Sequence, residues 1–92
     1  MSETINCTLQ ITNTRGLHAR AAAKICALSE KFNAVIIISK DNIEVSSTSI
    51  MGLLLLDAPK GSEINITTKG PDATNAMINL KKLVENGFNE KY

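Results

Sequence analysis

The chain has 92 residues, 43% of them hydrophobic, which is enough for one compact core and too little for two. Lys+Arg 10 against Asp+Glu 9 leaves a formal net charge of +1, so bulk charge gives no support for binding to nucleic acid or to an anionic membrane surface. We therefore expect one domain over residues 1–92 that recognises its partners through a local site.

The cysteines and the apolar runs indicate the compartment. Cys7 and Cys26 are the only two cysteines and show no Cys-x-x-Cys spacing, and residues 1–6 lack the apolar core of a signal peptide. The apolar run at residues 53–56 is far too short to span a bilayer. We expect a cytoplasmic protein without membrane insertion, whose thiols are reduced and pack as small hydrophobic groups.

The first predicted elements are a strand and a helix. Residues 5–11 alternate between apolar and polar side chains, the period of a strand with one buried face. A turn cluster follows at residues 13–16, and a helix is predicted to begin near His18. Its buried stripe is expected to consist of residues spaced three and four apart: Ala22, Ile25, Cys26, Ser29 and Phe32.

A hairpin and a short helix are predicted next. Residues 34–39 are rich in β-branched side chains, and a turn separates them from a second short strand over residues 43–46. Hydroxyl side chains at residues 47–49 precede a predicted helix over residues 50–56, which ends before Pro59.

The last predicted elements complete the fold. Residues 61–69 alternate as a strand, and a final helix follows the Gly-Pro-Asp turn at 70–72 and closes with a glycine cap at 86–88. The order is β-α-β-β-α-β-α. We predict an α+β fold, an open-faced β-sandwich in which three helices cover one face of a four-stranded, mainly antiparallel sheet.

His18 is the only histidine, and it lies where a helix begins, between Arg15 and Arg20. Backbone N–H groups of the first turn, at Ala19 and Ala21, and the positive end of the helix dipole favour an anion there. A guanidinium adds donors for phosphate oxygens. The arrangement indicates a phosphorylated histidine, although an ordinary exposed loop histidine remains the alternative. One histidine without acidic or thiol partners cannot complete a metal site, and no Ser or Cys triad is present.

Residues 16–22, Gly-Leu-His-Ala-Arg-Ala-Ala, resemble the active-site signature of the HPr family, the phosphocarriers of the bacterial phosphoenolpyruvate-dependent phosphotransferase system. The likeness covers nearly the whole chain. It includes residues 49–52, which resemble the regulatory serine segment of HPr, and residues 55–61, which are similar to nitrogen-branch relatives called NPr.

The resemblance implies that His18 accepts a phosphoryl group at Nδ1 (the pros nitrogen) from a phosphorylated Enzyme I-type protein and passes it to an EIIA-type protein. Arg20 would steady the phosphoryl oxygens. The chain would act as a substrate of enzymes, without a cofactor and without turnover of its own. Most relatives have proline where this sequence has Ala21, which predicts a looser helix start with one additional N–H donor and an altered rate of transfer.

The helix predicted over residues 50–56 has apolar side chains all round, yet a helix on a sheet buries only one side. Leu53 and Leu56 suit the core, and the resemblance places the opposite side next to His18 as a docking surface. An ordinary core helix under a neighbouring element is the alternative. The expected docking residues are Leu17, Ile50, Met51 and Leu54.

Ser49 is either a target of an HPr kinase/phosphorylase, as the resemblance implies, or a plain N-cap hydroxyl. Phosphorylation there would put about two negative charges next to the apolar patch and weaken docking. We expect a monomer, serving either sugar uptake or nitrogen-branch regulation. The alternative function is a small α+β binding module in which His18 is not phosphorylated.

Overall fold

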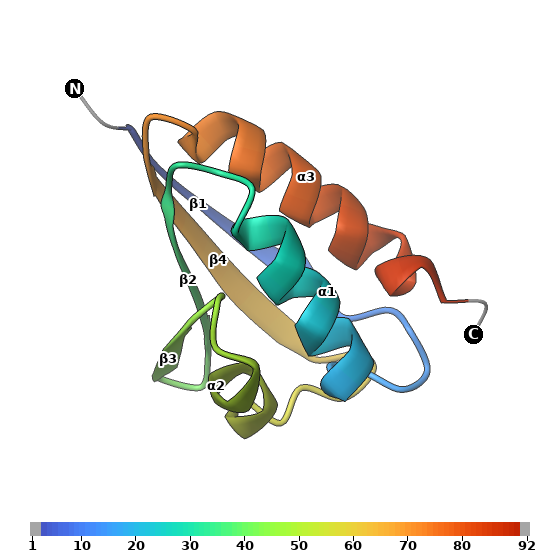
Figure 1. Ribbon diagram of the computed structural model, residues 1–92. Coiled ribbons are helices and arrows are strands. Elements are labelled where there is room, and N and C mark those ends of the chain that lie inside the picture. The colour runs from blue at the N-terminus through green and yellow to red at the C-terminus, as the bar shows by residue number, and fades with distance from the viewer. Residues whose placement is uncertain (1–2, 91–92) are drawn as a thin grey trace.

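A computed structural model describes residues 3–90 of the chain (Figure 1). The order of elements is the predicted one, with one additional 3-10 turn at the end: β1 (Glu3–Gln10), α1 (Ala19–Ser29), β2 (Val35–Lys40), β3 (Ile43–Ser46), α2 (Ile50–Leu55), β4 (Glu63–Gly70), α3 (Ala73–Glu85) and η1 (Gly87–Asn89).

The four strands form one sheet in the order β1-β4-β2-β3, and every neighbouring pair is antiparallel. Helices α1 and α3 lie across one face of the sheet, while α2 lies near β3 (Figure 1). Strand register explains which face they cover: Leu9 pairs with Ile64, and Ile38 pairs with Ile66, and all four side chains are buried. The predicted open-faced α+β sandwich is confirmed.

The other face of the sheet carries polar side chains that bond to one another. Asn6 Nδ2 donates to Thr67 Oγ1 at 2.7 Å, and Asn65 Nδ2 donates to Thr8 Oγ1 at 3.1 Å. Cross-strand pairs of this kind stabilise a sheet without apolar cover. The alternation read from the sequence therefore separates a covered face from an open one.

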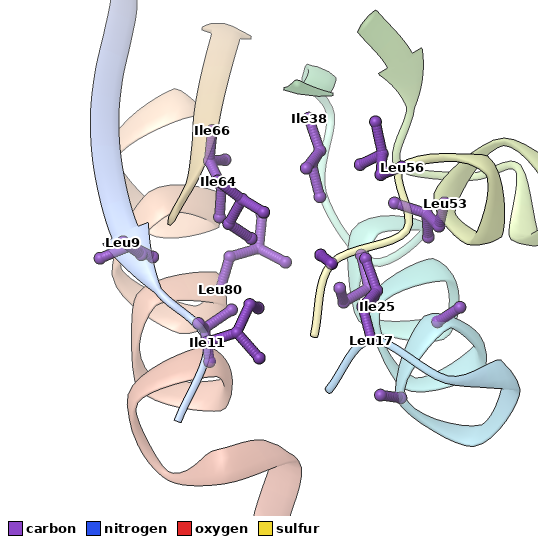
Figure 2. Close-up of a cluster of buried hydrophobic side chains, with 14 of the residues drawn as sticks. Leu9, Ile11, Leu17, Ile25, Ile38, Leu53, Leu56, Ile64, Ile66 and Leu80 are labelled. Atoms are coloured by element: carbon purple, nitrogen blue, oxygen red, sulfur yellow. The ribbon is translucent and has the colours of Figure 1, made fainter. Parts of the chain in front are cut away.

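The core lies between the sheet and the helices, and Figure 2 shows side chains from both layers meeting in one cluster. Helix α1 contributes Ala21, Ala22 and Ile25, and α3 contributes Ala76, Leu80 and Val84 at helical spacing. Burying the side chains of α1 fixes the position of that helix, and with it the position of His18, the residue that precedes it. Across residues 3–90, no helix combines the length and apolar character that a membrane crossing requires.

Two loops determine how the chain enters and leaves these elements. Asp41 and Asn42 have φ of 51° and 70°, the left-handed pair that a two-residue hairpin turn between β2 and β3 requires. Gly87 has φ of 62° and follows Asn86, the C-cap of α3, at the position where glycine commonly ends a helix. Beyond it, Phe88 is fully buried, so the segment that follows α3 folds back onto the domain.

Candidate phosphoryl-acceptor site

The loop before α1 is held in place by a glycine that packs against the chain following α2. Gly16 has φ of +68°, and a Cβ atom there would lie 2.6 Å from the Ala58 carbonyl oxygen. Leu17 N donates to that same oxygen at 2.9 Å. Only glycine fits this approach without strain, which explains the glycine two residues before His18.

His18 is the N-cap of α1. Its backbone is extended (φ −88°, ψ 179°), and its Nδ1 atom accepts a hydrogen bond from Arg20 N at 3.3 Å. The side chain is 22% exposed. Histidine thus takes the place that Ser, Thr, Asp or Asn usually occupies, and its nitrogen faces the N–H groups of the first turn. Ala19 and Ala21 supply further N–H groups of that turn, as the sequence predicted.

The other ring nitrogen, Nε2, pairs with the carboxylate oxygen Oε2 of Glu90. Glu90 comes from the last described turn, 72 positions further along the chain. Its second oxygen, Oε1, accepts a hydrogen bond from Asn13 Nδ2 at 2.8 Å, and Asn13 Nδ2 also donates to Gly16 O at 2.8 Å. The imidazole therefore lies between a helix N-terminus and a carboxylate.

The surroundings of Glu90 favour its charged form. The hydrogen bond from Asn13 is the main cause that lowers the pKa of the Glu90 carboxyl, and the hydrogen bond and charge of His18 and the charge of Lys24 lower it further. Burial acts in the opposite direction. Lys24 also donates to the backbone carbonyl of Phe88, which ties α1 to the turn that carries Glu90.

Neither Asn13 nor Glu90 was predicted as a site residue. Asn13 reads in sequence as one member of a turn cluster, and Glu90 stands four residues after the predicted helix cap at Asn86 with no motif around it. Their contact depends on the docking of Phe88 into the core, which is tertiary information. Only a rule that looks for a carboxylate partner for a lone histidine could have found Glu90.

Arg15 and Arg20 are both exposed, and within residues 3–90 neither guanidinium forms an ion pair. Arg20 follows His18 by two residues and lies on the first turn of α1. Its charge is therefore available at the site where the sequence predicts an anion.

Helix α2 presents an apolar surface. Its Leu53 is fully buried and the following Leu56 is 2% exposed, as predicted for the core side. The opposite side has four exposed apolar side chains, which we call the α2 patch: Ile50, Met51, Leu54 and Leu55. The sequence prediction named the first three and missed Leu55.

The expectation that Leu17 belongs to the docking surface is wrong. Its side chain is 6% exposed and belongs to the core cluster, and Figure 2 shows it beside Ile25 of α1. The reason is the turn at Gly16 and the bond from Leu17 N to Ala58 O, which direct this residue inward while His18 remains accessible.

Ser49 is the N-cap of α2, and its Oγ accepts a hydrogen bond from Gly52 N at 3.0 Å. The α2 helix and the loop at Gly16 are linked, because Ala58 and Pro59, which contact Gly16, lie in the short connection that follows α2. The structure thus brings the N-cap histidine and the C-terminal end of the α2 helix into one region of the molecule.

Comparison with known proteins gives consistent results. Residues 5–86 match the family model described as "PTS HPr component phosphorylation site". The phosphocarrier protein HPr of Xylella fastidiosa (strain Temecula1) is 44% identical over 82 residues, 89% of this chain and 92% of that protein. The phosphocarrier protein NPr of Escherichia coli K12 is 35% identical over 88 residues, 95% of this chain and 98% of that protein.

Solved structures agree with these relatives. A crystal structure of HPr from Thermoanaerobacter tengcongensis superposes with a TM-score of 0.91 at 35% identity, covering 96% of this chain and 99% of that one. A second structure from that organism, described as an HPr dimer, gives a TM-score of 0.75 at 37% identity and covers 91% of this chain and 97% of that one. The monomer expected from the sequence stays a prediction.

Proposed function

Because this chain belongs to the HPr family, the phosphocarriers of the phosphotransferase system, we propose that His18 is the residue that carries its phosphoryl group. The observation that supports this most directly is the direction of Nδ1, which faces the Arg20 N–H at the start of α1. A phosphoryl group on that nitrogen would have its oxygens next to unpaired N–H groups and the positive end of a helix.

The chemistry at Nδ1 requires no cofactor. The Nδ1 lone pair forms a bond to phosphorus, and the bond between phosphorus and the donor's atom breaks with its electrons returning to the donor. When the acceptor protein attacks, the same sequence runs with His18 as the leaving group. The chain is thus a carrier and not an enzyme, in line with the phosphocarrier relatives.

Three groups at the start of α1 suit the phosphoryl oxygens. The Arg20 guanidinium is exposed and has no ion-pair partner among residues 3–90, so it is available to them. The backbone N–H groups of Ala19 and Ala21 belong to the same first turn. Ala21 retains an N–H that the proline of most relatives lacks, which adds a donor at this point.

A phosphocarrier exchanges its phosphoryl group with a donor and an acceptor protein. We assign the donor to an Enzyme I-type protein and the acceptor to an EIIA-type protein, in the cytoplasm. The α2 patch is the docking surface that fits them, because Met51 is 74% exposed and Leu55 is 71% exposed, and the chain after α2 contacts the loop before His18. Met51 offers a side chain that adapts to more than one partner.

Ser49 is a second candidate modification site, for an HPr kinase/phosphorylase. Its hydroxyl lies at the start of α2, adjacent to the α2 patch. A phosphate there would add about two negative charges next to an apolar surface and weaken donor docking. Measuring donor affinity for Ser49→Asp tests this proposal, and unchanged affinity would overturn it.

The test of the carrier function is incubation of the purified protein with phosphoenolpyruvate and Enzyme I from the same source. We expect a mass increase of one phosphoryl group that is labile to acid and absent in His18→Ala. Absence of the adduct with an active Enzyme I, or its presence in His18→Ala, would contradict the assignment to His18. The first of these results would favour the alternative of a binding module that is not phosphorylated.

A further inference from the structure

We infer that Glu90 is a positioning residue for phosphoryl transfer: its carboxylate keeps the proton of His18 on Nε2 and thereby presents Nδ1 as the nucleophile. This inference rests on the proposed function of His18. It adds a residue from the far end of the chain to a site otherwise built from the start of α1.

The two neighbours of the ring select the same tautomer. Arg20 N is a donor only, so the Nδ1 atom that accepts its hydrogen bond carries a lone pair. The Glu90 carboxylate is an acceptor when ionised, so the Nε2 atom that faces it carries the proton. In a ring with the proton on Nδ1, that N–H would face the N–H of Arg20, and the lone pair on Nε2 would face the lone pairs of the Glu90 carboxylate. Neither pair of groups can form a hydrogen bond.

Glu90 is itself held from two sides, which distinguishes it from a surface carboxylate that meets a histidine by chance. Its Oε1 accepts a bond from Asn13, whose side chain is 2% exposed. Two residues before it in the chain, Phe88 is fully buried and its carbonyl accepts a bond from Lys24. The carboxylate therefore has a fixed orientation toward Nε2, with a side chain only 12% exposed.

The negative charge of the Glu90 carboxylate is opposite in sign to the charge that the His18 ring acquires during transfer. When Nδ1 forms its bond to phosphorus, the ring keeps the Nε2 proton and becomes a cation, and no proton leaves. An anion at Nε2 lowers the energy of that cation, and it holds the ring in the same orientation before and after transfer. The Arg20 N–H that faced the Nδ1 lone pair is then available to a phosphoryl oxygen.

The experiment uses the full chain labelled with ¹⁵N at histidine, where His18 is the only histidine and gives all the imidazole signals. We expect a proton coupled to Nε2 and a lone pair at Nδ1 in the unphosphorylated protein. In Glu90→Gln the signal of the Nε2 proton should move upfield and exchange faster with water. A proton on Nδ1 in the wild type, or an Nε2 proton that the substitution leaves unchanged, would overturn the inference.

Kinetics with Enzyme I provide the second readout. We expect Glu90→Gln to lower kcat for phosphoryl acceptance about tenfold with KM for the carrier unchanged, the low end for loss of a hydrogen bond to a charged group. Glu90→Asp should recover part of the rate. The matched control is Glu85→Gln, which changes an exposed glutamate at the end of α3 and should leave kcat as it is.

The outcomes separate this inference from the proposed function. If the wild type takes up no phosphoryl group, the assignment of His18 fails. If the wild type is phosphorylated and Glu90→Gln matches it in kcat, the role of Glu90 fails while the role of His18 stands.

Discussion

Helices α1 and α2 both begin at a residue whose side chain accepts a hydrogen bond from a backbone N–H of the first turn. His18 accepts from Arg20 N at 3.3 Å, and Ser49 accepts from Gly52 N at 3.0 Å. The backbone of both caps is extended, as it is at most helix N-caps. The same N-cap geometry therefore occurs at two helix starts within residues 3–90.

The surroundings of the two caps differ. His18 has a second nitrogen that faces Glu90, and an arginine without an ion-pair partner among residues 3–90 lies two residues away. Ser49 begins a helix of only six residues, and the exposed side chains of that helix are apolar. A cap hydrogen bond by itself thus predicts a helix start, whereas the partners around the cap residue determine its chemistry.

The largest expected effect is a loss of stability when the glycine in the loop before the α1 cap is replaced. Gly16→Ala places a Cβ atom 2.6 Å from Ala58 O and 2.8 Å from Pro59 Cα, at a φ of +68°. Overpacking and a left-handed backbone together should lower the free energy of unfolding by about 3 kcal/mol. Urea denaturation measures this change, and a loss below about 1 kcal/mol would show that the loop relaxes freely.

The matched control is the glycine of the second cap. A Cβ atom on Gly52 would lie 3.0 Å from Val45 Cβ and 3.0 Å from Ser49 Oγ, which is tight, but the residue is helical. Alanine gains about 1 kcal/mol of helix propensity over glycine, which offsets much of the crowding. Gly52→Ala should therefore remain within about 1 kcal/mol of the wild type.

The second effect concerns the charge next to the α1 cap. Arg20→Ala should lower the rate of phosphoryl acceptance about a hundredfold, because removing one donor that stabilises transition-state charge typically costs that much. Arg15→Ala is the matched control: it removes another exposed arginine, from the preceding loop. We expect a smaller loss there, and equal losses for both variants would indicate general attraction of the donor instead of a contact with the phosphoryl group.

These comparisons also show which parts of the molecule the sequence predicts. The period-two and helical patterns of the sequence were sufficient to predict the strands, the helices and the start of α1 at His18. The patch on α2 followed from the rule that a helix on a sheet buries one side, but a run of leucines at residues 53–56 has no clear period, so Leu55 was missed.

The rest of the site depends on contacts between distant parts of the chain. Asn13 and Glu90 are 77 positions apart, and they meet only because Phe88 is buried after α3. Leu17 was predicted as a docking residue, yet the turn at Gly16 directs it into the core. Local patterns cannot predict such contacts, since they arise when the whole chain packs.

The third effect separates the two roles of Ser49. Ser49→Ala removes the bond to Gly52 N and should lower the free energy of unfolding by about 1 kcal/mol, whereas Ser49→Asp keeps an N-cap oxygen and should retain most of the stability. The aspartate also adds a charge next to the α2 patch, so donor affinity should fall several-fold in Ser49→Asp only. Equal affinity in both variants would restrict Ser49 to capping.

The smallest expected effect is the dependence of stability on pH through Glu90. Its pKa is lowered in the folded protein, first by the bond from Asn13 and then by His18 and Lys24, so the unfolded chain binds a proton more readily as the pH falls. The contribution of Glu90 to stability is therefore fully present above the usual glutamate pKa. It is lost as the pH falls through the lowered value.

Glu90→Gln removes this contribution and keeps an oxygen that can accept from Asn13 Nδ2. The difference in free energy of unfolding between the wild type and Glu90→Gln should be largest near neutral pH and should close as the pH falls through the lowered pKa of Glu90. Urea denaturation over this range measures it, with Glu85→Gln for comparison. A difference that does not change with pH would mean that Glu90 acts on His18 by shape alone, and the contrast between the two caps would then lose its electrostatic basis.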